Sequence, residues 1–473
     1  MDVSSIECAG PERSPRKESA LARVRIRRLA PSIALFACSV ACTSPIFAQD
    51  SPPQLETQAS PAQATIPSEP QRNARFQPQA IPAIFPAQRR IEQELDAIAG
   101  PVAAIPADPL YQSDPLGPPL RPFRKVGNWA GETSHINFGA TYTFLNQYAT
   151  VTPYGVRHDQ LSGRLDVNGN WAVYSSPSTA GSIGLLVRSG TNIGMSQQWN
   201  LSDRLGSGLY LNCLQGGGEQ EPITLNILYW RQDFLARRLS FYVGKLHPNQ
   251  HISLSMFNND ERSQFLNGDS DGDLAIASDG TYAGGGAVEF QATPRIFIHA
   301  LAIDTEGAQQ RSIQTLVDRK YLEAIEVGWF KGFPGGKWVN YRGVLWRDDT
   351  ARLGSGHGGG IGFDHEFGNG WAPFGRFTQS TDKGTATKQI ECAGVVNTRP
   401  FGRRGDLFGT SFNWTKPSTR QGKRQEGIVE TFYRLRLTTS IEIGPDVEVS
   451  IHPTYAAKTY STVLLGSRMR IIF

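Results

Sequence analysis

The chain from Val126 to Phe473 is a series of strand-length segments in which apolar and polar residues alternate, separated by clusters of Gly, Asn, Asp and Pro. Successive side chains of a strand point to opposite faces, so this alternation predicts strands with one apolar and one polar face. Helical periodicity does not appear over this region. The pattern restricts the chain to all-β folds, of which a transmembrane barrel and a soluble β-sandwich both fit.

The last segment of the chain favours the barrel. From Val463 onward an apolar residue stands at every second position except Ser467, and the segment closes on Phe473. Such a strand is similar to the assembly signal of bacterial outer-membrane barrels, so we expect Phe473 and its strand to engage the barrel-assembly machinery. About 348 residues, at roughly 10 per strand plus turns, predict a transmembrane antiparallel β-barrel of about 16 strands.

Composition supports insertion into a membrane through strands rather than helices. The mean hydropathy is −0.33, too low for a bundle of transmembrane helices. A barrel tolerates this value because only alternate residues face lipid. The net charge of +4 falls to +1 without the first 48 residues, which hold seven basic and four acidic residues. A nucleic-acid-binding protein would keep a basic surplus, so we predict no nucleic-acid partner.

The first 125 residues predict two segments ahead of the barrel domain at 126–473. Residues 1–48 have a basic stretch and then an apolar core that ends at Ala48, as in a secretory signal peptide. Residues 49–125 are rich in Pro, Ala and Gln and are typical of a linker, with a short helix expected at Gln88–Ala99. An exported barrel belongs in the outer membrane of a Gram-negative-type bacterium, in contact with its lipid.

The polar faces of the strands carry charges at mid-strand, where they would cost a few kcal/mol on the lipid side of a barrel. We therefore predict that these side chains line the lumen, where guanidinium groups narrow the pore and donate hydrogen bonds to a solute. A rigid wall of paired charges is the alternative. The predicted pore-lining and substrate-contacting residues are Arg164, Asp166, Asn340, Arg342, Glu430, Arg434, Arg436, Arg468 and Arg470.

The aromatic residues divide between the two faces. Trp338 and Trp346 stand on the polar face of their strand, where structural packing and stacking on a sugar ring are both open. Tyr229, Tyr341 and Tyr433 fall on apolar faces, and we expect them to face lipid or to form an aromatic girdle.

Motifs for catalysis, cofactors and metals are weak. Gly268–Gly272 matches G-x-S-x-G and Gly354–Gly359 matches G-x-G-x-x-G, but neither lies between a strand and a helix. Asn267–Ser278 is similar to a calcium loop except at its last position, so we interpret it as an acidic extracellular loop. Cys213 and Cys392 leave a disulfide and two thiols both open. We predict no enzyme activity, no cofactor and no metal.

Several segments resemble, in sequence and in order, the carbohydrate-selective porin family of the OprB type. Gly127–Gly131 (GNWAG) resembles the family's entry motif, without the Arg that usually follows it, and Phe241–Lys245 (FYVGK) resembles a strand that ends on Gly and a basic residue. Pro400–Trp414 resembles the Gly-Arg-x-x-Asp-x-x-Gly strand of the family. The best match is Glu426–Pro453, whose matching residues are Glu430, Tyr433, Pro445, Asp446 and Pro453.

The resemblance covers the barrel region and implies a 16-stranded barrel with a charged constriction that selects sugars. We therefore predict an outer-membrane porin for passive diffusion of sugars and other small solutes, present as a monomer or a homotrimer. A general porin without sugar selectivity is the main alternative. An outer-membrane barrel enzyme, such as a lipase or deacylase, and a secreted β-protein that binds glycans are the others.

Overall fold

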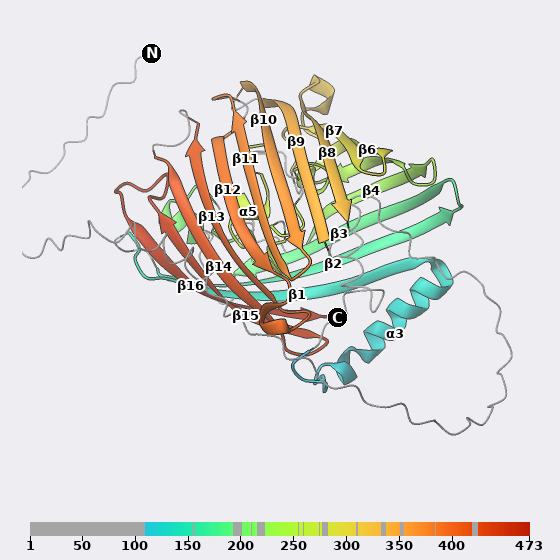
Figure 1. Ribbon diagram of the computed structural model, residues 1–473, viewed down its shortest axis with the longest axis horizontal. Helices are drawn as coiled ribbons and strands as arrows, with labels where there is room; N and C mark the ends of the chain where they lie inside the picture. The colour runs from blue at the N-terminus through green and yellow to red at the C-terminus, as the bar shows by residue number, and fades with distance from the viewer. Residues whose placement is uncertain are drawn as a thin grey trace, which may run out of the picture. The chain divides into compact units, whose positions relative to one another are not determined.

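The computed structural model describes residues 109–473 except 154, 156, 193–200, 210, 215–222, 254, 259, 274, 277–281, 309–310, 333–336, 351–353, 384 and 419–423. The predicted signal peptide, most of the predicted linker and the helix expected at Gln88–Ala99 lie outside the described residues. Within the described part, sixteen antiparallel strands close into one barrel, in which each strand pairs with its chain neighbours and β1 pairs with β16 (Figure 1). The predicted antiparallel barrel of about 16 strands is confirmed.

The elements follow one another around the barrel in chain order. The strands are β1 (Ile136–Ala149), β2 (Asp159–Ser175), β3 (Ala180–Asn192), β4 (Thr224–Phe234), β5 (Leu239–Leu246), β6 (Ala283–Thr293), β7 (Ile296–Asp304), β8 (Tyr321–Gly332), β9 (Lys337–Thr350), β10 (Gly354–Phe367), β11 (Trp371–Ser380), β12 (Thr387–Asn397), β13 (Leu407–Pro417), β14 (Glu426–Arg436), β15 (Ile441–Ile451) and β16 (Ser461–Ile472). The helices are α3 (Gly117–Ser134), α4 (Leu201–Leu205) and α5 (Gly268–Asp271), with 3-10 turns η2 (Pro248–Gln250), η3 (Leu316–Asp318) and η4 (Pro400–Gly402). None of the described helices combines the length and the apolar character needed to cross a membrane.

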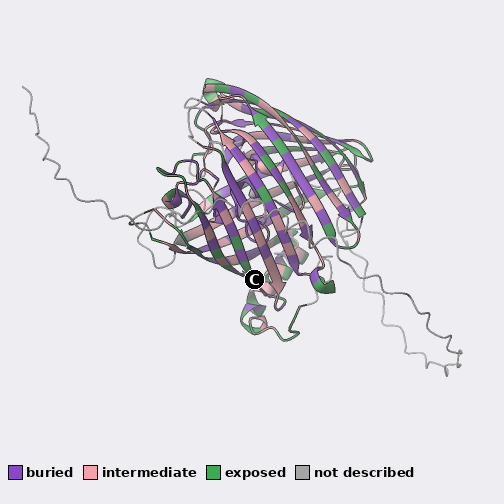
Figure 2. Ribbon diagram, turned by 60° about the vertical axis from the view of Figure 1, so that its left-hand side comes forward, coloured by how far each residue is buried: buried purple, intermediate pink, exposed green. Residues whose placement is uncertain are grey.

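Burial alternates along the strands, with polar side chains inside and apolar side chains outside (Figure 2). In β8, Glu326 is 1% exposed, whereas its neighbours Ile325 and Val327 are 47% and 49% exposed. This is the reverse of a soluble β-sandwich, which buries its apolar face. An apolar outer surface around a polar interior is what a barrel in lipid requires.

One predicted face is wrong because of a bulge. The register of β4 against β3 skips Asn226, which leaves an extra residue in β4. Beyond this residue the two faces of β4 exchange, so that Tyr229 is buried and Trp230 is exposed. The prediction that Tyr229 faces lipid is therefore wrong. Tyr341 is 49% exposed on the outer face, as predicted, and Tyr433 is half-buried.

Helix α3 crosses the boundary predicted between residues 125 and 126, and the first strand begins at Ile136. The GNWAG motif lies inside this helix. A Cβ at Gly127 would lie 3.7 Å from the carbonyl oxygen of Phe138, and one at Gly131 would lie 3.1 Å from Oδ1 of Asn137. Gly131 therefore allows the helix to approach the start of β1 closely, whereas a Cβ at Gly127 would make an ordinary van der Waals contact.

The two ends of the barrel differ in their connections. At the turn end, which holds the start of β1 and the end of β16, strands are joined by two to nine residues. At the loop end the connections include the two longest, 193–223 and 247–282. The described residues of 201–214 and 247–276 are mostly buried.

The 247–276 segment lies inside the barrel. It hydrogen-bonds to inward-facing side chains from opposite parts of the wall, including Arg164 of β2, Glu326 of β8 and Glu430 of β14. Figure 1 shows its short helix α5 among the strands. The interpretation of Asn267–Ser278 as an extracellular loop is therefore wrong: the side chain of Asn267, for example, is fully buried. Inward-facing polar groups of the wall replace water as its partners.

Candidate functional site

The first charged cluster inside the barrel joins β2 and β3 to the 247–276 segment. Arg164 Nε lies 3.0 Å from Asp166 Oδ2, and Arg188 Nε lies 2.7 Å from Asp166 Oδ1. Both guanidiniums also contact Oε1 of Glu261, at 3.2 Å for Arg188 Nη2. Two carboxylates are thus shared by two arginines. Burial opposes ionisation of Glu261, but Arg164 and Arg188 outweigh it and hold its pKa well below the usual range.

The second cluster gathers three arginines from β14 and β16 around one carboxylate. Arg436 Nη1 lies 2.6 Å from Glu442 Oε1, Arg470 Nη1 lies 3.4 Å from Oε2, and Arg434 Nε lies 4.0 Å from Oε1. The side chains of Arg434 and Arg436 remain 22% and 20% exposed, whereas that of Arg470 is 7% exposed. Three arginines therefore share the carboxylate of Glu442, and two of them are partly exposed.

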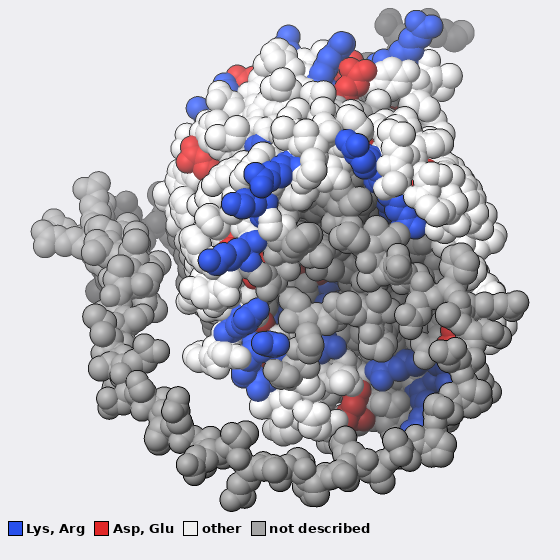
Figure 3. Space-filling view, turned by 45° about the vertical axis from the view of Figure 1, so that its right-hand side comes forward, with Lys and Arg blue, Asp and Glu red and all other residues white. Residues whose placement is uncertain are grey.

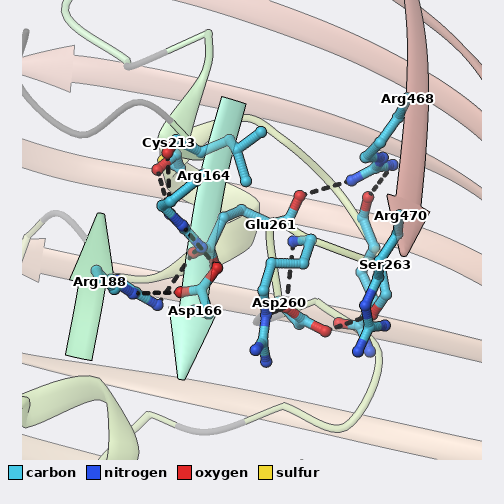
Figure 4. A network of polar contacts seen from close by, with 12 residues as sticks. Arg164, Asp166, Arg188, Cys213, Asp260, Glu261, Ser263, Arg468 and Arg470 are labelled. Carbon is cyan, nitrogen blue, oxygen red and sulfur yellow. Dashed lines mark hydrogen bonds and ion pairs between the residues drawn. The ribbon is translucent and has the colours of Figure 1, made fainter. Parts of the chain in front are cut away.

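Residues 260–264 lie between the two clusters (Figure 4). Arg468 of β16 donates to the backbone carbonyl oxygens of Glu261, at 2.7 Å, and Gln264, at 2.6 Å. Arg434 Nη1 donates to the carbonyl of Ser263 at 3.5 Å. The segment is thus held from both sides of the wall, by the arginines of β2 and β3 and by those of β14 and β16.

Carboxylates of β14 accept hydrogen bonds from the backbone of the 247–276 segment and from that of residues 201–214. Glu430 accepts hydrogen bonds from the backbone N–H of Leu266, at 2.7 Å, and of Asn267, at 3.0 Å, and from Asn267 Nδ2 at 2.6 Å. Glu426 accepts from the backbone N–H of Gly208 at 2.9 Å. These contacts give Glu430 a structural role, because its oxygens are occupied and its side chain is fully buried.

Asn340 and Arg342 form a third inward-facing group, on β9. Arg342 Nη1 lies 2.6 Å from Asp364 Oδ2, and Asn340 Nδ2 donates to the same oxygen at 3.5 Å. Ser255 of the inner segment donates to Oδ1 of Asp364. All three wall residues are 6% exposed or less, so this group anchors the segment to the wall. Trp338 and Trp346 face inward on the same strand and pack in two apolar clusters.

All nine residues predicted to line the lumen lie on the inner faces of their strands, and their contact with a solute stays a prediction. The alternation did not identify their partners Arg188, Glu261 and Glu442, which lay outside the prediction. A further group was missed where the inner segment meets β5, β6 and β8. There Tyr242 Oη donates to Glu289 Oε2 at 3.0 Å, and His251 Nδ1 lies 3.1 Å from Glu289 Oε1.

The two glycine motifs of the sequence lie in ordinary secondary structure. Gly354–Gly359 lies within strand β10, and Gly268–Asp271 is the single turn of α5. Cys213 and Cys392 are not joined by a disulfide bond. Across the residues that the structure describes, no three His, Cys, Asp or Glu side chains are arranged to hold a metal ion.

Asp269 of α5 is a buried acid whose pKa is raised toward neutral pH. Thr415 donates to its Oδ2, whereas Oδ1 has no hydrogen-bond partner among the described residues. Burial raises the pKa of Asp269 to about 7, against the opposing effects of Thr415 and Arg376. The folded state therefore binds this proton more tightly than the unfolded state, and the stability it contributes at low pH is lost as the pH rises from about 4 through 7.

We expect the unfolding temperature of the detergent-solubilised protein to fall between pH 5 and pH 8 for this reason. Asp269→Asn should remove this part of the fall, because Asn resembles the protonated acid. Asp114→Asn is the matched control, since hydrogen bonds from Ser440, Thr439 and other groups outweigh burial and lower the pKa of Asp114. An unchanged pH dependence in Asp269→Asn would contradict the assignment.

Comparison with known proteins finds similarity to porins. The model of the carbohydrate-selective porin family, OprB, matches residues 355–473. Porin AaxA of Chlamydia felis (strain Fe/C-56) is 24% identical over 321 residues, which cover 64% of this chain and 68% of that protein. The high-pH structure of Pseudomonas putida OprB superposes with a TM-score of 0.59 at 14% identity, over 73% of this chain and 97% of the other. The resemblance to the OprB family is thus confirmed: residues 355–473 match its sequence model, and the described chain has the barrel fold of a solved OprB.

Proposed function

We propose that the chain is an outer-membrane porin through which sugars and other small neutral solutes diffuse passively. The observation that carries this proposal is a closed barrel with an apolar outside, whose polar inside holds the 247–276 segment between two arginine clusters. The family match over residues 355–473 supports sugars as the solutes. The relation to OprB also supports the outer membrane as its location.

The inward-facing arginines divide into two groups by exposure. The side chains of Arg188, Arg434 and Arg436 remain 19%, 22% and 20% exposed, whereas those of Arg164 and Arg342 are 6% and 3% exposed. Guanidinium N–H groups donate hydrogen bonds that sugar hydroxyls accept. We assign contact with solute to the exposed group, of which Arg188 and Arg434 also hold the inner segment. The buried group serves only to position that segment.

This assignment is tested by current through single channels in a planar bilayer, with sugars titrated into the bath. We expect saturable block by sugar. Arg436→Gln should weaken the sugar's apparent affinity by roughly tenfold, because a hydrogen bond from a charged donor is lost. Arg347→Gln, at an arginine whose side chain is 61% exposed at the loop end, should leave the block unchanged. Equal effects of the two substitutions would contradict the assignment.

Conductance without block by any sugar would favour the second candidate, a general porin. The charged clusters are consistent with this alternative as well, because side chains on a lumen wall set the width of the pore, and that width excludes solutes by size.

Assembly in the outer membrane should depend on Phe473. Its backbone N–H donates to the carbonyl of Ala140 at 3.0 Å, and its ring lies 6.0 Å from that of Phe123 in helix α3. We expect deletion of Phe473 to lower the amount of folded protein in the outer membrane, measured by the mobility shift of unheated barrel on an SDS gel. Phe412→Ala, which removes an exposed outward Phe of β13, is the control. Equal yields from the two variants would contradict a role in assembly.

A further inference from the structure

The turn end of the barrel carries basic side chains without acidic partners. Six exposed residues there make no ion pair with any described residue. They are Arg121, Lys125, Arg295, Lys331, Lys337 and Arg404, named here the basic belt. Figure 3 shows Lys and Arg side chains gathered on the face that the right-hand side of Figure 1 presents, with few Asp or Glu among them.

The loop end holds paired and unpaired basic residues. The paired ones include Arg157 with Asp159 at 2.9 Å and Arg347 with Asp349 at 3.0 Å. Lys388 pairs in the same way with Asp382 at 3.0 Å. Arg311, Arg319 and Lys383 are also exposed there and make no ion pair with a described residue, so unpaired positive charge by itself occurs at both ends of the barrel.

Aromatic side chains stand next to the basic belt on the outer surface. Trp329 precedes Lys331 by two residues on the same face of β8 and is 36% exposed, and Trp371 at the start of β11 is 42% exposed. Phe401 is 90% exposed in the turn between β12 and β13, three residues before Arg404. Aromatic side chains on a membrane barrel lie at the level of the lipid headgroups. The belt residues beside them are thus placed where headgroup phosphates lie.

We propose that the basic belt binds anionic phospholipids of the periplasmic leaflet, of the phosphatidylglycerol or cardiolipin class. The proposal rests on the location of the barrel in the outer membrane, where short turns face the periplasm. Guanidinium and ammonium groups donate to phosphodiester oxygens, and the exposed aromatic rings contact the adjoining glycerol and upper acyl groups. The belt thereby attaches the turn end to one leaflet and fixes the depth of the barrel in the membrane.

The test is native mass spectrometry of the full chain in detergent, with phosphatidylglycerol, cardiolipin or phosphatidylcholine of the same acyl chains added. The test variant combines Arg295→Gln, Lys331→Gln, Lys337→Gln and Arg404→Gln. The matched control removes four exposed basic residues from the loop end, by Arg311→Gln, Arg319→Gln, Arg347→Gln and Lys383→Gln. A third variant keeps the charge of the belt, with Lys331→Arg and Lys337→Arg.

We expect the two anionic lipids to bind in preference to phosphatidylcholine. The test variant should weaken their binding about fivefold or more, given the attraction of one basic residue to an anionic surface. The loop-end control and the charge-conserving variant should bind as the unchanged chain does.

Equal retention of phosphatidylcholine, or equal loss in test variant and control, would overturn the proposal. Displacement of the lipid by inorganic phosphate would also overturn it, because the site would then hold the ion rather than the lipid. Lipid binding is measured without any current through the channel. A failure of the lipid proposal is therefore distinguishable from a failure of the porin proposal.

Discussion

Glu261→Gln is expected to release the inner segment from β2 and β3 and to raise the conductance of the channel. The carboxylate of Glu261 is shared by Arg164 and Arg188, both of which otherwise have only Asp166 as an acidic partner in the cluster. Removing one member of a buried ion-pair cluster leaves an unpaired buried charge and costs about 3–5 kcal/mol. That amount is enough to shift residues 260–264 away from the wall for much of the time.

Single-channel recording measures the effect as a larger mean current with more frequent transitions between levels. Glu323→Gln, which neutralises an exposed acid on the outer face of β8, provides the control for the change of net charge. The double variant Arg164→Gln, Glu261→Gln should be less severe than Glu261→Gln alone, because it removes a buried charge together with its partner. A single variant with the current and noise of the unchanged chain would show that Glu261 does not hold the segment.

Glu430→Ala is expected to unfold the inner segment locally around α5. The substitution removes the acceptor of three buried donors: the backbone N–H groups of Leu266 and Asn267 and the Asn267 side chain. Each buried donor left without a partner costs about 1–3 kcal/mol, so we expect a loss of about 3 kcal/mol or more. The closed barrel should persist, because the backbone hydrogen bonds of β14 to β13 and β15 do not involve this side chain.

Hydrogen exchange resolves this local effect from global unfolding. The amide protons of Leu266 and Asn267 should exchange roughly a hundredfold faster in Glu430→Ala, while those of β14 keep their protection. Val429→Ala, on the opposite face of the same strand, is the control for a change of side-chain volume. Equal protection of Leu266 in the two variants would contradict the anchoring role of Glu430.

The strands were predictable from sequence because a barrel in lipid imposes one rule on every strand. Alternation along Val429–Leu437 predicts Glu430 and Arg434 inside, and both face inward in the structure. The rule fails where a bulge interrupts the alternation of inward and outward side chains. The bulge at Asn226 does so in β4, and Tyr229 therefore faces inward. Helix α3 was also missed, because Pro122 and two glycines interrupt its sequence pattern.

The site was only partly predictable, since half of it lies on a segment without periodicity. Glu442 could have been found: the four-residue turn 437–440 pairs Arg436 with Glu442 in register, and both fall on the inner face. Glu261 offered no such signal. Its position depends on the path of the 247–276 segment through the barrel, which is fixed by contacts with β2, β8 and β14 far away in sequence. Local patterns do not encode such contacts.

Swelling of liposomes that contain the purified barrel shows whether sugars pass through it, because it measures entry of the uncharged solute itself. Liposomes are diluted into isotonic solutions of sugars of increasing size, and the rate of swelling reports the rate at which each sugar enters. We predict swelling in monosaccharides that slows steeply as the sugars become larger, and faster entry of large sugars in Glu261→Gln. Folded barrel in the liposomes without swelling in any sugar would contradict a sugar-conducting porin.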